Sequence, residues 1–162
     1  LFLRPILVFS QALPVFALAP ILTLWLGYGL GSKIAMAVLI IFFPVTSAFF
    51  DGLMNTPRGY LDLAQTMGAS TRHIMLKIRI PAALPSLASG MKLAAAYAPI
   101  GATIGEWVGS SQGLGYLMLL ANGRVKTDLM FAAMLTLGVM SVTLYALISL
   151  ALYRMIDYER PS

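Results

Sequence analysis

The chain of 162 residues contains no cysteine, a single histidine and few charged side chains. Without cysteine, neither a disulfide framework nor a thiolate metal site can form, and His73 alone cannot supply a histidine cluster for zinc. Charged residues make up 10% of the chain, whereas soluble domains usually carry about 25%. So few charges cannot cover the surface of a globular domain of this size, which excludes an ordinary soluble protein.

Apolar side chains are abundant, at 59% of the residues. They gather in four segments that approach the length of about 20 residues needed to cross ~30 Å of hydrocarbon. These segments run over about 6–25, 34–50, 84–108 and 129–153. Prolines inside them are tolerated in a membrane bundle, where neighbouring helices and hydroxyl groups satisfy the freed carbonyls. The sequence therefore predicts an all-α polytopic bundle, a single permease-like domain over 1–162, with further spans expected before Leu1.

The net charge of +5 does not form one basic face of the kind that nucleic acid requires. If the polar stretch 51–80 is cytoplasmic, most of the basic residues fall on the cytoplasmic side, as membrane topology favours. Those on that side or at its boundary are Arg4, Arg58, Arg72, Lys77, Arg79, Arg154 and Arg160. Lys33, Arg124 and Lys126 would lie outside.

The stretch 51–80 predicts a short amphipathic helix. Thr56 followed by Pro57 is typical of a helix cap with proline at the first helical position. The apolar side chains then recur at helical spacing on one side, and Gly68 can adopt the left-handed conformation that ends a helix. The residues on the apolar side are Tyr60, Leu63, Ala64 and Met67.

A second short helix is predicted after Gly68, capped by Ser70 or Thr71 and ended by Pro81. The apolar side of the first helix needs a cover, which lipid headgroups, packing within the chain or a groove on a partner protein could each provide. The pattern alone leaves these alternatives open.

The spacing within this stretch resembles a known signature. Asp62-Leu63-Ala64, three residues, Gly68, nine residues and then Ile78-Arg79-Ile80-Pro81 is similar to the cytoplasmic motif of ATP-binding-cassette (ABC) importer permeases. In that family the motif reads Glu-Ala-Ala, three residues, Gly, nine residues and Ile-x-Leu-Pro. The resemblance implies a type I importer permease fold with short cytoplasmic coupling helices, seated in a cleft of the ATPase. The implied coupling residues are Tyr60, Asp62, Leu63, Ala64, Met67, Gly68, Ile78 and Pro81.

Other stretches narrow the resemblance to one branch of importer permeases. The segments 19–34, 42–45, 81–86 and 106–117 are similar to permeases for nitrate, sulfonates, taurine and thiamine pyrimidine precursors. Within that branch, 98–102 and 105–109 look most like hydroxymethylpyrimidine permeases. The implied solute is hydroxymethylpyrimidine or a related precursor; sulfonate, taurine, nitrate and riboflavin-type solutes remain alternatives.

The resemblance also implies partners and a location. The partners are a dimer of cytoplasmic ATP-binding-cassette ATPases, an extracytoplasmic solute-binding protein and a second permease subunit, which is expected to be a second copy of this chain, with a close relative as the alternative. The location is the bacterial inner membrane, which the chain would cross several times. The chain itself is expected to bind no cofactor and to have no catalytic site. Gly113-x-Gly115 lacks the preceding strand and the Gly-Lys-Ser/Thr of a phosphate loop, so a partner would hydrolyse the ATP.

Four residues of the third apolar segment are candidates for the translocation path: Tyr97, Pro99, Glu106 and Trp107. An acid at membrane depth can line a water-filled path, but Glu106 can equally cap a helix or pair with Arg124 at the interface. Trp107 and Tyr97 could stack on a flat heterocycle, although aromatic residues also gather at membrane interfaces. Gly101-x-x-x-Gly105 and Gly90-x-x-x-Ala94 predict close helix packing.

Two rival functions are weaker. A secondary transporter often carries paired ionisable groups at mid-membrane, which the four apolar segments do not show. An intramembrane enzyme would need a nucleophile and base or metal ligands on facing spans, and His73 lies in the polar stretch instead.

Overall fold

The computed structural model describes residues 15–157, and the regular elements in that part of the chain are all helical. In order they are α2 (Val15–Leu26), α3 (Leu30–Met54), α4 (Arg58–Thr66), α5 (Thr71–Ile74), the π-helical turn η1 (Met75–Arg79), α6 (Ile80–Gly109), α7 (Leu114–Gly123) and α8 (Thr127–Asp157). The predicted all-α fold is confirmed.

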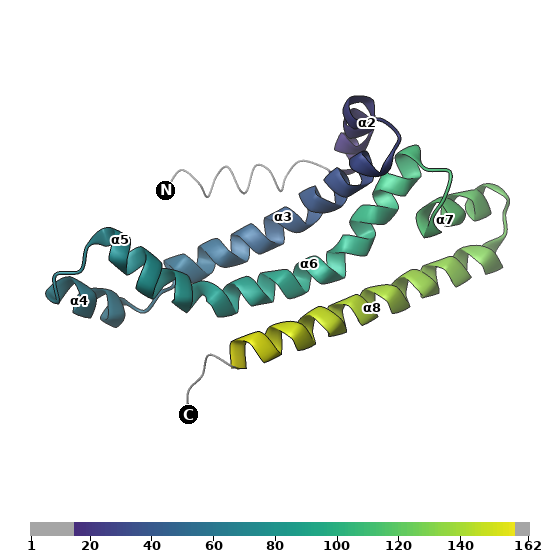
Figure 1. Cartoon of the computed structure of the whole chain (residues 1–162). Coiled ribbons are helices and arrows are strands. Elements are labelled where there is room, and N and C mark those ends of the chain that lie inside the picture. Colours follow the sequence, from purple (N-terminus) through teal and green to yellow (C-terminus); the bar gives the residue numbers. More distant parts are fainter. Residues whose placement is uncertain (1–14, 158–162) are drawn as a thin grey trace.

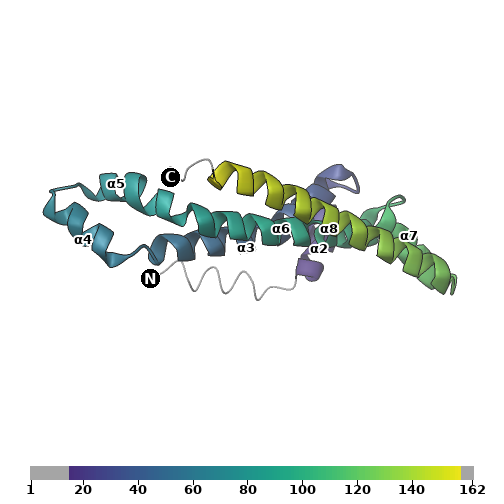
Figure 2. The same ribbon diagram turned by 90° about the horizontal axis from the view of Figure 1, so that it is seen from below.

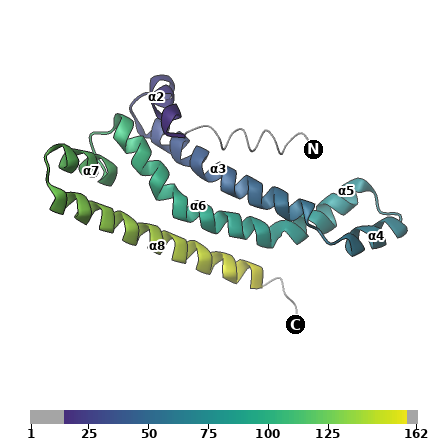
Figure 3. The same ribbon diagram turned by 180° about the vertical axis from the view of Figure 1, so that it is seen from behind.

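Three long helices, α3, α6 and α8, lie side by side and give the molecule an elongated shape (Figure 1). The hairpin of α4 and α5 projects beyond one end of these helices, while α2 and α7 lie at the other end, as the view from behind also shows (Figure 3). Seen from below, α8 runs along α6 and its C-terminal end points toward the hairpin end (Figure 2). The chain therefore has two distinct ends joined by a helical stem.

Two helices of the described part are long and apolar enough to cross a membrane, over Leu30–Met54 and Thr127–Arg154. They correspond to the second and fourth predicted segments. The third predicted segment lies within α6, which has 30 residues and a length of about 45 Å at 1.5 Å per residue but is not one of these two helices. Of the first predicted segment, residues 6–14 lie outside the described residues, and α2 covers the remainder as a short apolar helix.

Helices α3 and α6 pack through small residues. A Cβ atom added at Gly101 would lie 2.8 Å from the Cα atom of Ala37, and one added at Gly90 would lie 2.9 Å from the Pro44 carbonyl oxygen. At Gly105 the corresponding atom is the Cα of Lys33, at 3.1 Å. The two backbones thus approach as closely as small residues allow, which increases the van der Waals contact that holds membrane helices together. The predicted packing role of Gly101 and Gly105 is confirmed.

This contact predicts that replacing Gly101 with alanine destabilises the protein. The added methyl group meets the backbone of α3, which cannot move aside as a flexible side chain would. Overpacking of this kind costs about 1–3 kcal/mol. Gly138→Ala in α8 is the matched control, because its methyl group would meet nothing within 4 Å. A melting temperature in lipid nanodiscs that falls equally for both variants, or for neither, would contradict the close approach.

Candidate functional site

The hairpin of α4 and α5 turns at Gly68, whose φ of 73° lies in the left-handed region. Two hydrogen bonds close the end of α4: the Gly68 N–H donates to Gln65 O and the Ala69 N–H donates to Ala64 O, both at 2.9 Å. This pair of bonds is the Schellman motif, which satisfies the last carbonyls of a helix. The predicted helix end at Gly68 is confirmed.

The start of α4 differs from the prediction. Pro57, with ψ of 129°, occupies the N-cap position, and α4 begins at Arg58. The Thr56 hydroxyl donates to Leu53 O at 3.1 Å and therefore closes the end of α3 instead of capping α4. A threonine hydroxyl can donate to the carbonyl of an earlier residue as readily as it can accept from the N–H of a later one. The prediction of an N-cap was wrong for this reason.

Part of the apolar side of α4 is buried in the interior of the hairpin, and the rest is exposed to solvent. Ala64 is 7% exposed and Ile74 of α5 is 9% exposed, so these two lie in the small core between the helices. Beside them is a hollow of about 190 Å³ lined by Leu61, Gln65, Thr71, Ile74, Met75 and Arg79. By contrast, the three large residues of the predicted apolar side are open to solvent, at 61% for Tyr60, 60% for Leu63 and 77% for Met67. We call these three residues the docking face.

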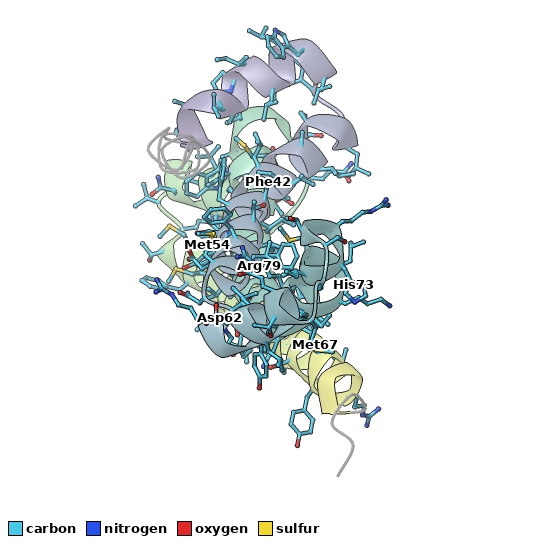
Figure 4. All side chains as sticks on the ribbon, turned by 90° about the vertical axis from the view of Figure 1, so that its left-hand side faces the viewer. Phe42, Met54, Asp62, Met67, His73 and Arg79 are labelled. Carbon is cyan, nitrogen blue, oxygen red and sulfur yellow. The ribbon has the colours of Figure 1, made fainter. Side chains whose placement is uncertain are left out.

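Polar side chains lie on both sides of the hairpin (Figure 4). Viewed from the hairpin end, Met67 lies at the lower edge, with Asp62 and His73 on opposite sides of the hairpin (Figure 4). Asp62 and His73 are both exposed. The His73 N–H donates to the Ser70 hydroxyl at 3.3 Å, so Ser70 caps α5 and the first of the two predicted caps is confirmed.

Pro81 does not end the second helix, contrary to prediction. The chain continues from α5 through the π-helical turn Met75–Arg79 into α6, with Pro81 in the first turn of α6. The Ile80 N–H bonds to Met75 O, five residues back, and Pro81 has no N–H to give. A turn widened in this way accommodates the proline ring, which would clash with the preceding turn of a regular α-helix. Ile78 of the predicted motif is half-buried in the π-turn.

The opposite end of the stem holds Glu106, close to the start of α7. The Gly115 N–H donates to Glu106 Oε2 at 2.6 Å, so the carboxylate caps this helix from the neighbouring α6. Gly113 has φ of 116°, and a side chain there would collide with the Glu106 carboxylate. The two glycines of Gly113-x-Gly115 therefore make room for an acid, and the alternative in which Glu106 caps a helix is the one that the geometry favours.

The other three candidate path residues also lie on α6, but not together. Trp107 is 40% exposed and Tyr97 is 43% exposed, so each is only partly covered by the rest of the described chain. Pro99 is half-buried and its carbonyl accepts the Thr103 hydroxyl at 2.8 Å. At about 100° per residue, Pro99 and Glu106 share one side of the helix, Tyr97 lies on the opposite side, and Trp107 lies between the two sides. The assignment of the four to a path stays a prediction.

One contact at this end escaped the sequence analysis. The Lys33 ammonium donates to the Ser110 hydroxyl at 2.7 Å, across 77 positions of the chain. It lies in an open depression of about 600 Å³ between the start of α3 and the end of α6. The lining residues are Tyr28, Gly29, Leu30, Lys33, Trp107, Val108, Gly109, Ser110, Ser111 and Gln112. No spacing in the sequence signals a pair so far apart.

A family model described as "Binding-protein-dependent transport system inner membrane component" matches residues 1–158. The chain is 60% identical over 154 residues to a "Probable ABC transporter permease protein" of Haemophilus influenzae, covering 95% of this chain and 63% of that protein. It is 42% identical over 144 residues to a formylaminopyrimidine transport permease of Halalkalibacterium halodurans, covering 89% and 58%. It is 38% identical over 157 residues to a riboflavin transport system permease of Chloroflexus aurantiacus, covering 97% and 59%. The chain thus spans less than two thirds of the length of these curated relatives.

The capping contact predicts that Glu106→Ala loosens α7 while Glu106→Gln largely preserves it. Alanine leaves the Gly115 N–H without its acceptor, a loss worth about 0.5–2 kcal/mol for a helix cap, whereas the glutamine amide oxygen can still accept. Hydrogen exchange of the segment containing Gly115 should quicken in Glu106→Ala alone. Equal exchange in all three proteins would show that the carboxylate does not hold the helix.

Proposed function

We propose, because the chain belongs to the family of binding-protein-dependent transport system inner membrane components, that it is the coupling part of an ABC importer permease. The permease would carry a small polar solute into the cell, delivered by a binding protein on the outside and driven by ATP that a partner hydrolyses. The observation that carries this proposal is the exposed docking face of the hairpin.

The proposed orientation places the hairpin in the cytoplasm. Arg58, Arg72, Lys77 and Arg79 belong to the hairpin or its turn, and Arg154 lies near the end of α8 that points the same way (Figure 1). Basic residues favour the cytoplasmic side of a membrane, so this distribution supports the assignment. The depression around Lys33 would then open on the extracytoplasmic side.

The docking face is better suited to a groove on a partner protein than to lipid headgroups or to packing within the chain. In the described part of the chain, Tyr60, Leu63 and Met67 are more than half exposed, so packing within this segment does not cover them. The hairpin projects along the stem, beyond the helices that are apolar enough to span the membrane, and this direction carries the face away from the lipid (Figure 3). A complementary groove on a partner protein is a recurring cover for the apolar side of an amphipathic helix, and we infer that the groove belongs to the ATPase.

The π-turn offers a route by which movement of the ATPase reaches the membrane. Helix α5, η1 and α6 run without interruption from Thr71 to Gly109. A displacement of the hairpin is therefore passed directly to α6 and from there to the depression at its far end. Rigid-body movement of this kind is common in switching proteins. A second permease subunit would complete the path against the side of α6 that carries Tyr97.

The proposed solute is hydroxymethylpyrimidine or a related thiamine pyrimidine precursor. Two of the relatives described above are named for solutes with flat nitrogen heterocycles, formylaminopyrimidine and riboflavin. The alternatives within the same branch are riboflavin-type solutes, sulfonates, taurine and nitrate. Competition by each of these against uptake of labelled hydroxymethylpyrimidine would rank them.

The docking face predicts that Leu63→Asp prevents the permease from holding its ATPase. Burying a charge in an apolar groove without a partner is costly, so the ATPase should no longer copurify with the full-length permease, and ATP-driven uptake into proteoliposomes should stop. The permease itself should still insert, because Leu63 is exposed.

Gln65→Glu is the matched control. It adds a negative charge on the same helix and is also exposed, but it lies about 160° around the helix from Leu63, on the side of the hollow. Copurification of the ATPase with Leu63→Asp at the level of this control would rule out the docking face. Uptake that persists after ATP is depleted would instead favour an ATP-independent transporter.

A further inference from the structure

The depression around Lys33 has the volume of a binding site for a small molecule. Its volume of about 600 Å³ falls within the range of about 300–1,000 Å³ usual for ligand pockets. It lies at the far end of α3 from the hairpin, a separation of about 36 Å for 25 residues at 1.5 Å each. It is therefore separate from the docking face.

Two aromatic rings border the depression and are held in place. The Trp107 indole N–H donates to Gly115 O at 2.9 Å, and its ring meets the Phe16 ring edge-on with centroids 6.4 Å apart. The Tyr28 ring lies against Gly109, where an added Cβ would stand 2.8 Å from Tyr28 Cδ1. Trp107 nevertheless keeps 40% of its surface exposed, and Tyr28 keeps 69%. Fixed, partly exposed rings are suitable platforms for stacking a flat ligand.

The polar groups of the depression are also fixed by contacts that leave hydrogen-bonding capacity free. The Ser110 hydroxyl donates to Gln112 O at 2.5 Å and accepts from the Gln112 N–H at 3.1 Å and from Lys33 Nζ at 2.7 Å. Its single proton and both lone pairs are thereby used. These bonds hold the main chain of Gln112, while its side-chain amide stays exposed. An ammonium has three donors, so Lys33 retains two after bonding to Ser110.

The exposed amide of Gln112 matches one class of heterocycle. A primary amide presents a donor and an acceptor side by side, the arrangement that pairs glutamine with the ring nitrogen and exocyclic amine of adenine. An aminopyrimidine offers the same two groups along one edge. The Lys33 ammonium can donate to a further ring nitrogen or hydroxyl.

We propose that this depression is a receiving site for an aminopyrimidine, which stacks on Trp107 and Tyr28 and hydrogen-bonds to Gln112 and Lys33. The site rests on the proposed import function and adds to it the place where the solute first meets the permease. Because the depression borders the end of α6, a bound solute lies against the same continuous helix that reaches the hairpin.

Tryptophan fluorescence of the full-length permease in lipid nanodiscs tests this site directly. Titration with 4-amino-5-hydroxymethyl-2-methylpyrimidine should give saturable quenching, because a stacked ring alters the Trp107 emission. The same quenching should appear in Trp25→Phe and vanish in Trp107→Phe. Trp25 is the matched control, since it is 80% exposed on α2 and does not line the depression.

Gln112→Ala provides a second variant of the binding site that leaves Trp107 and its contacts in place. Loss of the side-chain amide should raise the dissociation constant at least about tenfold, as expected when a two-point hydrogen bond to a base edge is removed. Quenching that is absent, that survives in Trp107→Phe, or that is unchanged in Gln112→Ala would overturn the site. Stronger binding of taurine or phosphate, abolished in Lys33→Gln, would show an anion site instead and would overturn the heterocycle assignment.

An uptake assay separates the site from the proposed function. With the ATPase and the binding protein present, ATP-dependent uptake of the pyrimidine without any quenching refutes the receiving site and leaves the importer intact. Saturable, Trp107-dependent quenching without ATP-dependent uptake refutes the importer and leaves the site. Uptake together with Trp107-dependent quenching supports both.

Discussion

Helices α3 and α6 approach so closely that a methyl group at Gly101 would lie 2.8 Å from the Cα atom of Ala37. The two ends of the molecule to which we have assigned functions both depend on this contact. At one end the same two helices lead into and out of the α4–α5 hairpin, and at the other end the start of α3 and the end of α6 enclose the Lys33 depression. Glycine at positions 90, 101 and 105 thus fixes the position of the hairpin relative to the depression.

A stem held by backbone contact is stiff, and stiffness is what a coupling device requires. Close-packed interiors move as units and transmit displacement between discrete arrangements. The hairpin is joined to α6 through the π-turn without a break, whereas it meets α3 through the non-helical residues Asn55 to Pro57. We infer that α6 carries the movement and that α3 follows through the glycine contacts.

The sequence predicted those features that depend on local chemistry. The helix end at Gly68 and the cap at Ser70 follow from residue type, and the docking face follows from helical spacing. The sequence did not predict features that depend on distant partners or on competing local bonds. The Lys33–Ser110 contact joins positions 77 apart, Thr56 bonded backward to α3, and the π-turn replaced the helix stop expected at Pro81. Helix capping was one of the roles that the sequence suggested for Glu106, but only the fold shows that the capped helix is α7.

The proposed topology places the hairpin and the Lys33 depression on opposite sides of a membrane. The cysteine-free sequence makes single-cysteine labelling simple for this region. Ser111→Cys at the depression and His73→Cys on the hairpin both place the thiol at exposed positions. With a membrane-impermeant maleimide, Ser111→Cys should be labelled in intact cells and His73→Cys only after permeabilisation. Labelling of both in intact cells, or the reverse order, would contradict the proposed topology.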